Sequence, residues 1–305
     1  MVASSIGARL GPRSRWLDID GPIHFVEWPG PSDRTFVLVH GLGGSHLNWM
    51  RVAPALAEHG RVVVVDLPGF GRSPLAGRRS AMHVGRRLLG GFVQRVSTGR
   101  AVVAGNSMGG GYAMLVAAFE PELVDGLILT GSVFPWVPGG WPSPVVIGGF
   151  SVYRTPIVGD LVVRERLRHV DPEVVVRWGL RLTTADPSSI PPDVVRAHVA
   201  LVRERQRDPD GAPAFLEAAR SILWLGARPW LSARVMDAIS CPVLVVHGTR
   251  DRLVPLAFAR AAVERHPRWR YRFLANVGHV PQLEAPGRWI AAVEGWLGAL
   301  EAPAR

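Results

Sequence analysis

The sequence contains no lysine: all 35 of its lysine and arginine residues are arginine, and they outnumber the 25 acidic residues, for a net charge of +10. Without lysine the chain has no Gly-Lys-Ser/Thr sequence, which excludes the phosphate-binding loop of the common nucleotide hydrolases. The arginines are spread along the chain and form no block, which indicates a general coding bias better than a nucleic-acid footprint. We therefore expect no nucleic-acid partner.

Cysteine is almost absent as well. Cys241 is the single cysteine, so the chain forms no intramolecular disulfide, and its position at the start of an apolar segment is typical of a buried structural thiol. Residues 1–16 lack the continuous apolar stretch of a secretion signal. No segment reaches the roughly 18 apolar residues, free of charge and proline, that a transmembrane helix requires. We expect a cytoplasmic protein.

Short apolar segments alternate with helix-like ones over the first 130 residues and again near the C-terminus. Segments 35–40 (TFVLVH) and 61–66 (RVVVVD) are apolar almost throughout, which is typical of parallel strands buried on both faces. Residues 15–20 and 22–28 predict an antiparallel hairpin at one edge. The alternation predicts an α/β protein whose sheet is covered by helices on both sides. The expected strands are 15–20, 22–28, 35–40, 61–66, 100–105, 124–130, 241–248 and 270–274, and the expected core helices are 46–58, 80–97, 107–119, 255–265 and 286–300.

The alternation is interrupted between residues 132 and 235. This segment is rich in proline, tryptophan and arginine, and it contains helix-like stretches but no convincing pair of apolar strands. Long insertions are tolerated at the C-terminal edge of such a sheet, where ligands bind. We therefore expect one α/β core, formed by residues 15–131 and 236–301, and a helical cap formed by residues 132–235. The helix-like stretches are 159–169, 172–182, 192–206 and 212–223.

The sequence Gly105-Asn106-Ser107-Met108-Gly109 follows an expected strand and opens an expected helix. In that context a G-x-S-x-G sequence forms a sharp turn that exposes the serine hydroxyl. The glycines on both sides remove side chains that would collide with the neighbouring strand and helix. The helix N-terminus also offers free N–H groups to a developing oxyanion. Ser107 is therefore the candidate nucleophile.

A serine nucleophile needs a general base and an acid that orients the base. His279 lies on a loop just after the last expected strand and is the candidate base. Asp251 follows the strand at 241–248 and stands between the serine and the histidine in chain order, as the acid of such a set does. The alternatives are ordinary ones: His279 as a helix cap, and Asp251 as a turn or capping residue before Pro255.

The glycine-rich segment 40–44 (HGLGG) follows the strand at 35–40. Its glycines allow backbone N–H groups to turn toward a bound oxyanion, and we predict an oxyanion hole formed by the N–H groups of Leu42 and Met108. The alternatives are an ordinary turn or a phosphate cradle. The G-x-G-x-x-G spacing of a dinucleotide site is absent, because His46 stands at its last position. We predict neither a cofactor site nor a metal site.

Five landmarks occur in order: HGLGG (40–44), DLPGFGRS (66–73), GNSMGG (105–110), HGTRD (247–251) and GHVPQLE (278–284). With these landmarks the chain resembles the α/β-hydrolase family over most of its length. The resemblance implies a mostly parallel, eight-stranded sheet flanked by helices, with a helical cap over the active site. It also implies cofactor-free catalysis through an acyl-enzyme.

The resemblance leaves the chemistry open within the family. Haloalkane dehalogenases and epoxide hydrolases carry aspartate where Ser107 stands, which disfavours both. The GNSMGG form is similar to the meta-cleavage C–C hydrolases, but those proteins usually carry a tryptophan shortly after the histidine, where this chain has residues 280–283 (VPQL). Thioesterases and cofactor-free haloperoxidases remain alternatives. We expect a serine hydrolase that cleaves an ester of an apolar small molecule.

The strongly apolar segment 134–150 (FPWVPGGWPSPVVIGGF) bears on the substrate. As a lid over the site it would favour acyl chains or aromatic esters, and the alternative is that it merely packs onto the sheet. An arginine-rich face and an apolar cap would also suit a lipase in peripheral contact with a membrane. A ligand receptor built on the same fold is the non-enzymatic alternative.

Overall fold

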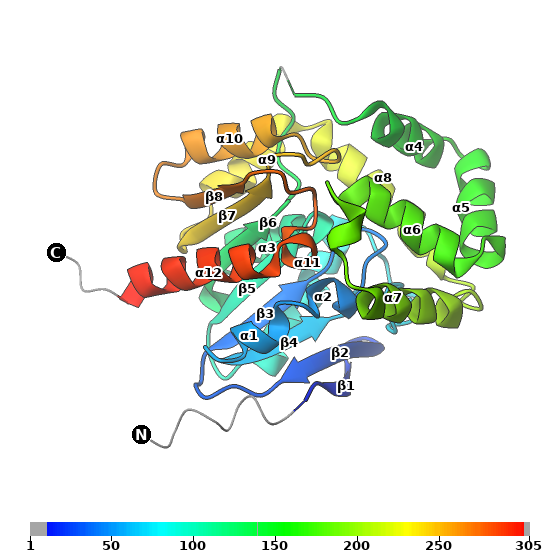
Figure 1. Ribbon diagram of the computed structural model, residues 1–305. Coiled ribbons are helices and arrows are strands. Elements are labelled where there is room, and N and C mark those ends of the chain that lie inside the picture. Colours follow the sequence, from blue (N-terminus) through cyan, green and yellow to red (C-terminus); the bar gives the residue numbers. More distant parts are fainter. Residues whose placement is uncertain (1–10, 139, 302–305) are drawn as a thin grey trace.

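A computed structural model describes residues 11–138 and 140–301, which form an eight-stranded sheet with helices on both faces (Figure 1). The strand order is β1-β2-β4-β3-β5-β6-β7-β8. Strand β2 pairs antiparallel with β1 and β4, and every other neighbouring pair is parallel. The expected fold class, a mostly parallel α/β sheet of eight strands, is confirmed. The strands are β1 (Arg13–Asp18), β2 (Pro22–Trp28), β3 (Thr35–Val39), β4 (Arg61–Val65), β5 (Ala101–Asn106), β6 (Val124–Thr130), β7 (Val243–Gly248) and β8 (Arg270–Leu274).

The helices outside the segment 132–235 pack directly on the sheet or close its loops. The longer ones begin and end close to the expected bounds. The short α11 was not expected, and it follows the loop that carries His279. These elements are η2 (His46–Trp49), α1 (Ala53–Leu56), α2 (Met82–Val96), α3 (Met108–Phe119), η3 (Pro121–Leu123), α10 (Leu256–Arg265), α11 (Pro281–Glu284) and α12 (Pro286–Glu301).

The expected helix at 46–58 is instead two short helices, η2 and α1. The side chains of Ser45 and Asn48 form a capping box at the start of η2. Pro54 has no N–H to donate, so it is tolerated in the first turn of α1 but not inside a continuous helix. The prediction of one helix was wrong because apolar spacing alone does not register these two signals.

Alternate residues of the central strands pack on opposite faces of the sheet. In β3, Val37 and Val39 pack with α2, α3 and α10 in one core cluster. Phe36 and Leu38 pack with α1 and α12 in the other. Because helices cover both faces, the strand has no solvent-facing position, and its sequence is therefore apolar from Phe36 to Val39.

Six α-helices lie between β6 and β7, and α4 to α8 gather together on one side of the sheet (Figure 1). The expected stretches match α5 to α8, whereas α4 and α9 were not expected. Proline opens both helices, and Gly148 and Gly149 lower the helix propensity of α4. The division into separate core and cap domains stays a prediction. The helices are α4 (Pro144–Arg154), α5 (Val158–His169), α6 (Pro172–Thr183), α7 (Pro192–Arg205), α8 (Gly211–Gly226) and α9 (Pro229–Asp237), with a short η4 (Pro187–Ser189) between α6 and α7.

In the part of the chain that the structure describes, no single helix has both the length and the hydropathy to cross a bilayer. Helices α4 and α5 reach both only as a pair, across a bend of 111°. Cys241 is buried, and burial raises the pKa of its thiol to about 11.

Candidate active site

Ser107 stands between the end of β5 and the first residue of α3, with φ 55° and ψ −119°. A serine rarely adopts such a backbone, and strain of this kind concentrates at functional turns. The flanking glycines make it fit. A Cβ atom at Gly105 would lie 2.3 Å from the carbonyl O of Gly109, and one at Gly109 would lie 2.4 Å from the carbonyl O of Val39. A side chain at either position would displace the turn that presents Ser107.

The structure brings His279 and Asp251 into direct contact. Nδ1 of His279 lies 2.7 Å from Oδ2 of Asp251. The other carboxylate oxygen, Oδ1, accepts hydrogen bonds from the backbone N–H groups of Leu253 and Val254 at 2.8 and 2.9 Å. Because the carboxylate can only accept, the imidazole proton belongs on Nδ1, which leaves Nε2 as the basic atom of the ring.

The Asp251 side chain has no exposed surface, and its surroundings nevertheless favour the charged carboxylate. Burial by itself would raise the pKa of this carboxyl, but the charges and hydrogen bonds of its partners, His279 first among them, hold the pKa below its ordinary value. A second imidazole belongs to this environment. Nε2 of His247 lies 2.9 Å from the carbonyl O of Val254 and 3.3 Å from Oδ2 of Asp251, and burial lowers the pKa of His247. Two imidazoles therefore approach the same carboxylate oxygen of Asp251, Oδ2.

Asn106 connects the serine turn to the histidine loop. Its Nδ2 donates to the carbonyl O of His279 at 3.1 Å and to that of Thr130 at 2.9 Å. The N–H of Ser107 donates to the same Thr130 carbonyl. Gly131 lies against this junction, where a Cβ atom would come within 2.5 Å of the His279 carbonyl O and 3.3 Å of its Nδ1. The three expected residues therefore lie at one edge of the sheet, after β5, β7 and β8.

Residues of the segment between β6 and β7 hold the other side of the His279 loop. The N–H of His279 donates to the carbonyl O of Thr183, at the end of α6, at 2.6 Å. The Glu284 carboxylate accepts from the N–H of Gly278 at 2.7 Å and from two backbone N–H groups that follow α6, at 2.9 and 3.0 Å. The loop is thus fixed both to the core, through Asn106, and to the segment between β6 and β7.

The peptide between Gly41 and Leu42 faces the serine turn. A Cβ atom at Gly41 would lie 3.0 Å from Cβ of Ser107. The Gly41 carbonyl O accepts hydrogen bonds from Nδ1 of His40 at 2.7 Å and from the N–H of Gly44 at 3.0 Å. Because a trans peptide points its C=O and N–H in opposite directions, the N–H of Leu42 is turned away from those donors. Met108 begins α3, so its N–H has no partner within the helix. Both amides suit the predicted oxyanion hole.

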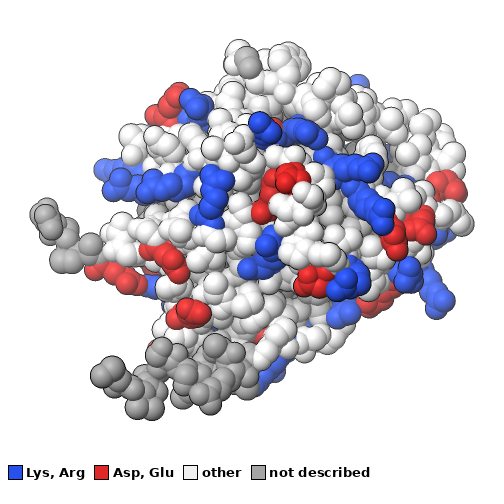
Figure 2. Space-filling view, viewed as in Figure 1, with Lys and Arg blue, Asp and Glu red and all other residues white. Residues whose placement is uncertain are grey.

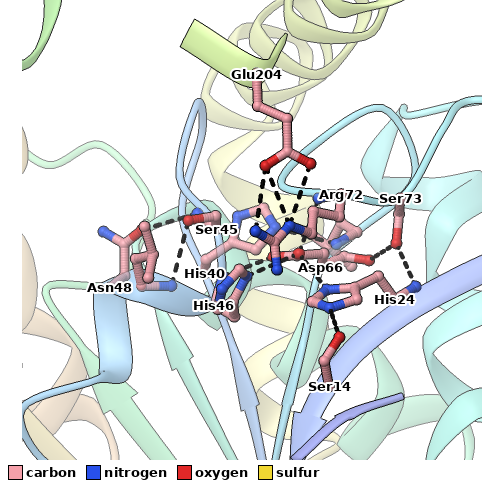
Figure 3. A network of polar contacts seen from close by, with 12 residues as sticks. Ser14, His24, His40, Ser45, His46, Asn48, Asp66, Arg72, Ser73 and Glu204 are labelled. Atoms are coloured by element: carbon pink, nitrogen blue, oxygen red, sulfur yellow. Dashed lines mark hydrogen bonds and ion pairs between the residues drawn. The ribbon is translucent and has the colours of Figure 1, made fainter. Parts of the chain in front are cut away.

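The segment that carries Leu42 is held at both ends by residues that follow β4 (Figure 3). At its start, Nε2 of His40 accepts from the N–H of Leu67 at 3.0 Å. Burial lowers the pKa of His40 to about 4, so the ring is neutral at pH 7, with one donor and one acceptor nitrogen, as these two contacts require. At its end, the Asp66 carboxylate accepts from the N–H of His46 at 2.6 Å and lies 2.9 Å from Nδ1 of the same residue.

Asp66 also reaches β2 and the loop after β4. Its Oδ2 lies 2.7 Å from Nδ1 of His24 and accepts from the N–H of Arg72 at 2.9 Å, while Oδ1 accepts from the N–H of His46 (Figure 3). Burial alone would raise the pKa of Asp66, but hydrogen bonds from His24 and His46 hold it well below its ordinary value. We call this arrangement of His24, His40, His46 and Asp66 the Asp66 clamp.

Three members of the Asp66 clamp are also the one group of histidine and acidic side chains, among residues 11–138 and 140–301, whose donor atoms lie close enough to hold a metal ion. These atoms of His24, His46 and Asp66 are within 4.8 Å of one another. Both imidazole–carboxylate contacts, however, are direct hydrogen bonds of 2.7 and 2.9 Å. The existing contacts account for the geometry without a metal, and we assign the group to the clamp.

Comparison with known proteins gives the family. The model of the alpha/beta hydrolase fold matches residues 34–286. The chain belongs to this family.

A pimeloyl-(acyl-carrier protein) methyl ester esterase from Aeromonas hydrophila is 30% identical to this α/β-hydrolase over 266 residues, which cover 86% of this chain and 94% of the relative. A 2-hydroxy-6-oxononadienedioate/2-hydroxy-6-oxononatrienedioate hydrolase from Cupriavidus pinatubonensis is 27% identical over 276 residues, 88% of each chain. The crystal structure of Cfl2 from Burkholderia cenocepacia superimposes with a TM-score of 0.77 at 25% identity, over 94% of this chain and 96% of that one. The family and these relatives support hydrolase activity.

The α/β-hydrolase contains a cavity of about 760 Å³ beside the site. Its wall combines Met114 of α3 and Phe258 of α10 with Phe150, Leu223 and Val235 of the segment between β6 and β7, so it is strongly apolar. The wall also includes Val133, whose N–H donates to the Ser107 carbonyl O at 3.3 Å, and Leu253, whose N–H donates to Asp251. Neither Ser107 nor Asp251 lines the cavity itself, and these two hydrogen bonds connect its wall to them.

Sequence reasoning missed Asn106, His247, Glu284 and the Asp66 clamp. Each of the first three lies inside a landmark that the sequence displays: GNSMGG, HGTRD and GHVPQLE. Their presence there was the available signal, but their roles depend on partners in other parts of the chain.

Replacing Gly131 by alanine should displace His279. The new Cβ would overlap the His279 carbonyl, and the φ of +49° at this position disfavours alanine. We expect turnover of an activated ester to fall by about 10²-fold, because displacements near 1 Å cost about that much. The control is Gly179→Ala on α6, where an added Cβ meets no atom within 4 Å. Equal kcat values for the two variants would contradict the assigned position of His279.

Replacing Asp66 by asparagine should destabilise the fold by about 3–5 kcal/mol, because one side of a buried charged network is lost and an amide N–H₂ then faces donors. The pKa of Asp66 lies below its ordinary 3.8, so its carboxylate stabilises the fold at pH values above about 4, and this contribution is lost progressively as the pH falls further. Urea unfolding at pH 7, 5 and 3.5 measures both effects, and the difference between wild type and variant should narrow only at the lowest pH. Asp33→Asn, at an exposed position, is the control. If the free energy of unfolding of Asp66→Asn at pH 7 equals that of wild type, the Asp66 clamp does not stabilise the fold.

Proposed function

We propose that the protein is a serine hydrolase that cleaves a carboxylic ester, or a related acyl compound, of an apolar small molecule through an acyl-enzyme. Two observations carry the proposal: Ser107 has a strained backbone beside Asn106, which binds the His279 carbonyl, and the Nδ1 of His279 is held by the buried Asp251 carboxylate. In such a set the serine attacks, the histidine moves the proton, and the acid holds the ring in one tautomer.

The residues would act in a definite order. Nε2 of His279 takes the proton of the Ser107 hydroxyl while Oγ forms a bond to the carbonyl carbon of the substrate. The N–H groups of Leu42 and Met108 donate to the resulting oxyanion, and removal of one such donor in a hydrolase costs about 10²–10³ in kcat. His279 then protonates the departing alkoxide, and water repeats the sequence on the acyl-enzyme.

The apolar wall of the cavity supports an apolar substrate. A cavity of about 760 Å³ falls within the range that encloses a small organic molecule. The methyl ester esterase among the relatives acts on an ester, as its name states, which supports the ester among the acyl compounds considered.

C–C bond hydrolysis is the second candidate. The relative from Cupriavidus pinatubonensis is named as a hydrolase of an oxononadienedioate, and the sequence GNSMGG at 105–110 is similar to that class. The same serine, histidine and acid would serve in it. A substrate panel that combines p-nitrophenyl esters of increasing chain length with an acyl-thioester and a ring-fission diketone separates these reactions, because the proposal expects the highest kcat/KM on an ester.

The Ser107→Ala variant should lose roughly 10⁶-fold in kcat on the best ester of the panel, the loss seen when the nucleophile of such a set is removed. It should also lose covalent labelling by a fluorophosphonate, whereas Ser97→Ala, at the end of α2, should keep it. Wild-type turnover in Ser107→Ala would disprove the assignment. A wild-type protein that neither turns over the panel nor takes the label would favour a ligand receptor on the same fold.

A further inference from the structure

Most of the large apolar side chains that are exposed lie in the segment between β6 and β7. Large exposed apolar patches on a protein surface usually mark an interaction site. Figure 2 shows a broad uncharged area over α4 and the loop before it, whereas charged residues of both signs are interspersed over the rest of this face. The exposed side chains of the segment are Trp136, Trp141, Val145, Ile147, Ile157, Val158, Leu161, Val162, Val174, Trp178, Trp224 and Trp230.

Three of these side chains form the mouth of the cavity. Trp136, Ile147 and Trp224 line the cavity and are 40%, 43% and 46% exposed. Trp141, which is 70% exposed, packs edge-on against Trp136, with 5.7 Å between the ring centroids. The apolar interior of the cavity therefore continues onto the outer surface without a polar rim at these positions.

A second apolar feature lies at the corner between α4 and α5. Ile157 is 81% exposed and has a φ of +66°, a strained conformation for a β-branched residue. Val158, Leu161 and Val162 follow at i, i+3 and i+4 on one side of α5, and all three are exposed. We call Ile157, Val158, Leu161 and Val162 the apolar corner. Arg154, in the last turn of α4, also lines the cavity, so the cavity wall runs along α4 from Ile147 toward the corner.

The loop before α4 and α4 itself carry charge of one sign. Residues 132–159 contain no aspartate or glutamate, and their single charged residue is Arg154. Between α8 and α9, the guanidinium carbon of Arg228 lies 4.2 Å from the ring centroid of Trp224. The nearest acid along the chain, Asp160, is paired with Arg220 at 3.0 Å. The surface therefore combines exposed tryptophans and aliphatic side chains with arginines, and its own loop and helix supply no carboxylate.

The combination of exposed tryptophans, aliphatic side chains and arginines favours one of three binding partners: a second copy of the chain, a nucleic acid or a lipid bilayer. At a two-fold interface between copies of the chain, the arginines of one copy would face those of the other, which electrostatics disfavours. A nucleic acid would leave the apolar corner unused. A bilayer accommodates all three features: tryptophan suits the headgroup region, aliphatic side chains suit the acyl region, and arginine pairs with anionic phosphate.

We propose that the mouth of the cavity and the apolar corner dock on an anionic phospholipid surface, so that an apolar substrate passes from the bilayer into the cavity beside Ser107. The substrate part of this inference rests on the proposed serine hydrolase function, while the docking part stands on the surface alone. Docking places Trp136, Trp141 and Trp224 at the headgroups and Ile157 and Leu161 among the acyl chains.

Vesicle flotation tests the docking directly. Wild type should bind vesicles of phosphatidylglycerol and phosphatidylcholine in equal parts, bind pure phosphatidylcholine more weakly, and lose affinity as NaCl is raised to 0.5 M. Leu161→Glu should weaken binding at least tenfold, because an inserted aliphatic group becomes a charge. Arg228→Gln should weaken it about fivefold on the anionic vesicles. The matched control is Leu300→Glu on α12, an exposed leucine away from the mouth and the corner, which should bind as wild type does.

Turnover of a soluble p-nitrophenyl ester in the absence of vesicles measures the proposed hydrolase activity independently of docking. Leu161→Glu should retain this turnover, and retention would also show that the variant is folded. With an ester dissolved in the vesicles, wild type should be faster than Leu161→Glu. Absence of wild-type binding to anionic vesicles would overturn the docking proposal and leave the hydrolase function standing. A dimer in sedimentation that Leu161→Glu dissociates, without vesicle binding, would assign the surface to a second copy and would also overturn it.

Discussion

The hydrogen bond between Nδ1 of His279 and Oδ2 of Asp251 decides what the rest of the site can do. A buried carboxylate that stays charged can only accept, so it draws the imidazole proton to Nδ1 and leaves Nε2 free to act as a base. The bond is useful only if both partners are immobile. The N–H groups of Leu253 and Val254 hold the carboxylate, and Asn106 and Glu284 hold the histidine loop from opposite sides.

Most of the fold could be predicted because the central strands β3 to β7 are buried on both faces and appear as short apolar runs. Ser107, Asp251 and His279 could be predicted to lie together because each follows a strand of the parallel sheet, and parallel strands end at one edge. The break in the helix at 46–58 could not be predicted from periodicity, because a capping box and Pro54 divide the segment. Helix α4 could not be predicted because its glycines lower the helix propensity of a segment that is nevertheless helical.

The residues that support the site were beyond the reach of sequence reasoning because their partners are distant in the chain. His24 and Asp66 are 42 positions apart, and Asn106 and the His279 carbonyl are 173 apart. No periodicity or local pattern signals such pairs. The net charge of +10 as a total gave no information about a partner. The absence of acidic residues from α4 and from the preceding loop, which carries exposed tryptophans, leads to a specific hypothesis.

A crystal structure of the protein after reaction with a fluorophosphonate would decide the role of Ser107. We expect phosphorus bonded to Oγ of Ser107, a phosphoryl oxygen within about 3.1 Å of the N–H groups of Leu42 and Met108, and Nε2 of His279 facing the reacting centre while Nδ1 stays on Asp251. An adduct on another residue, or a phosphoryl oxygen turned away from both amides with His279 separated from Ser107, would contradict this expectation.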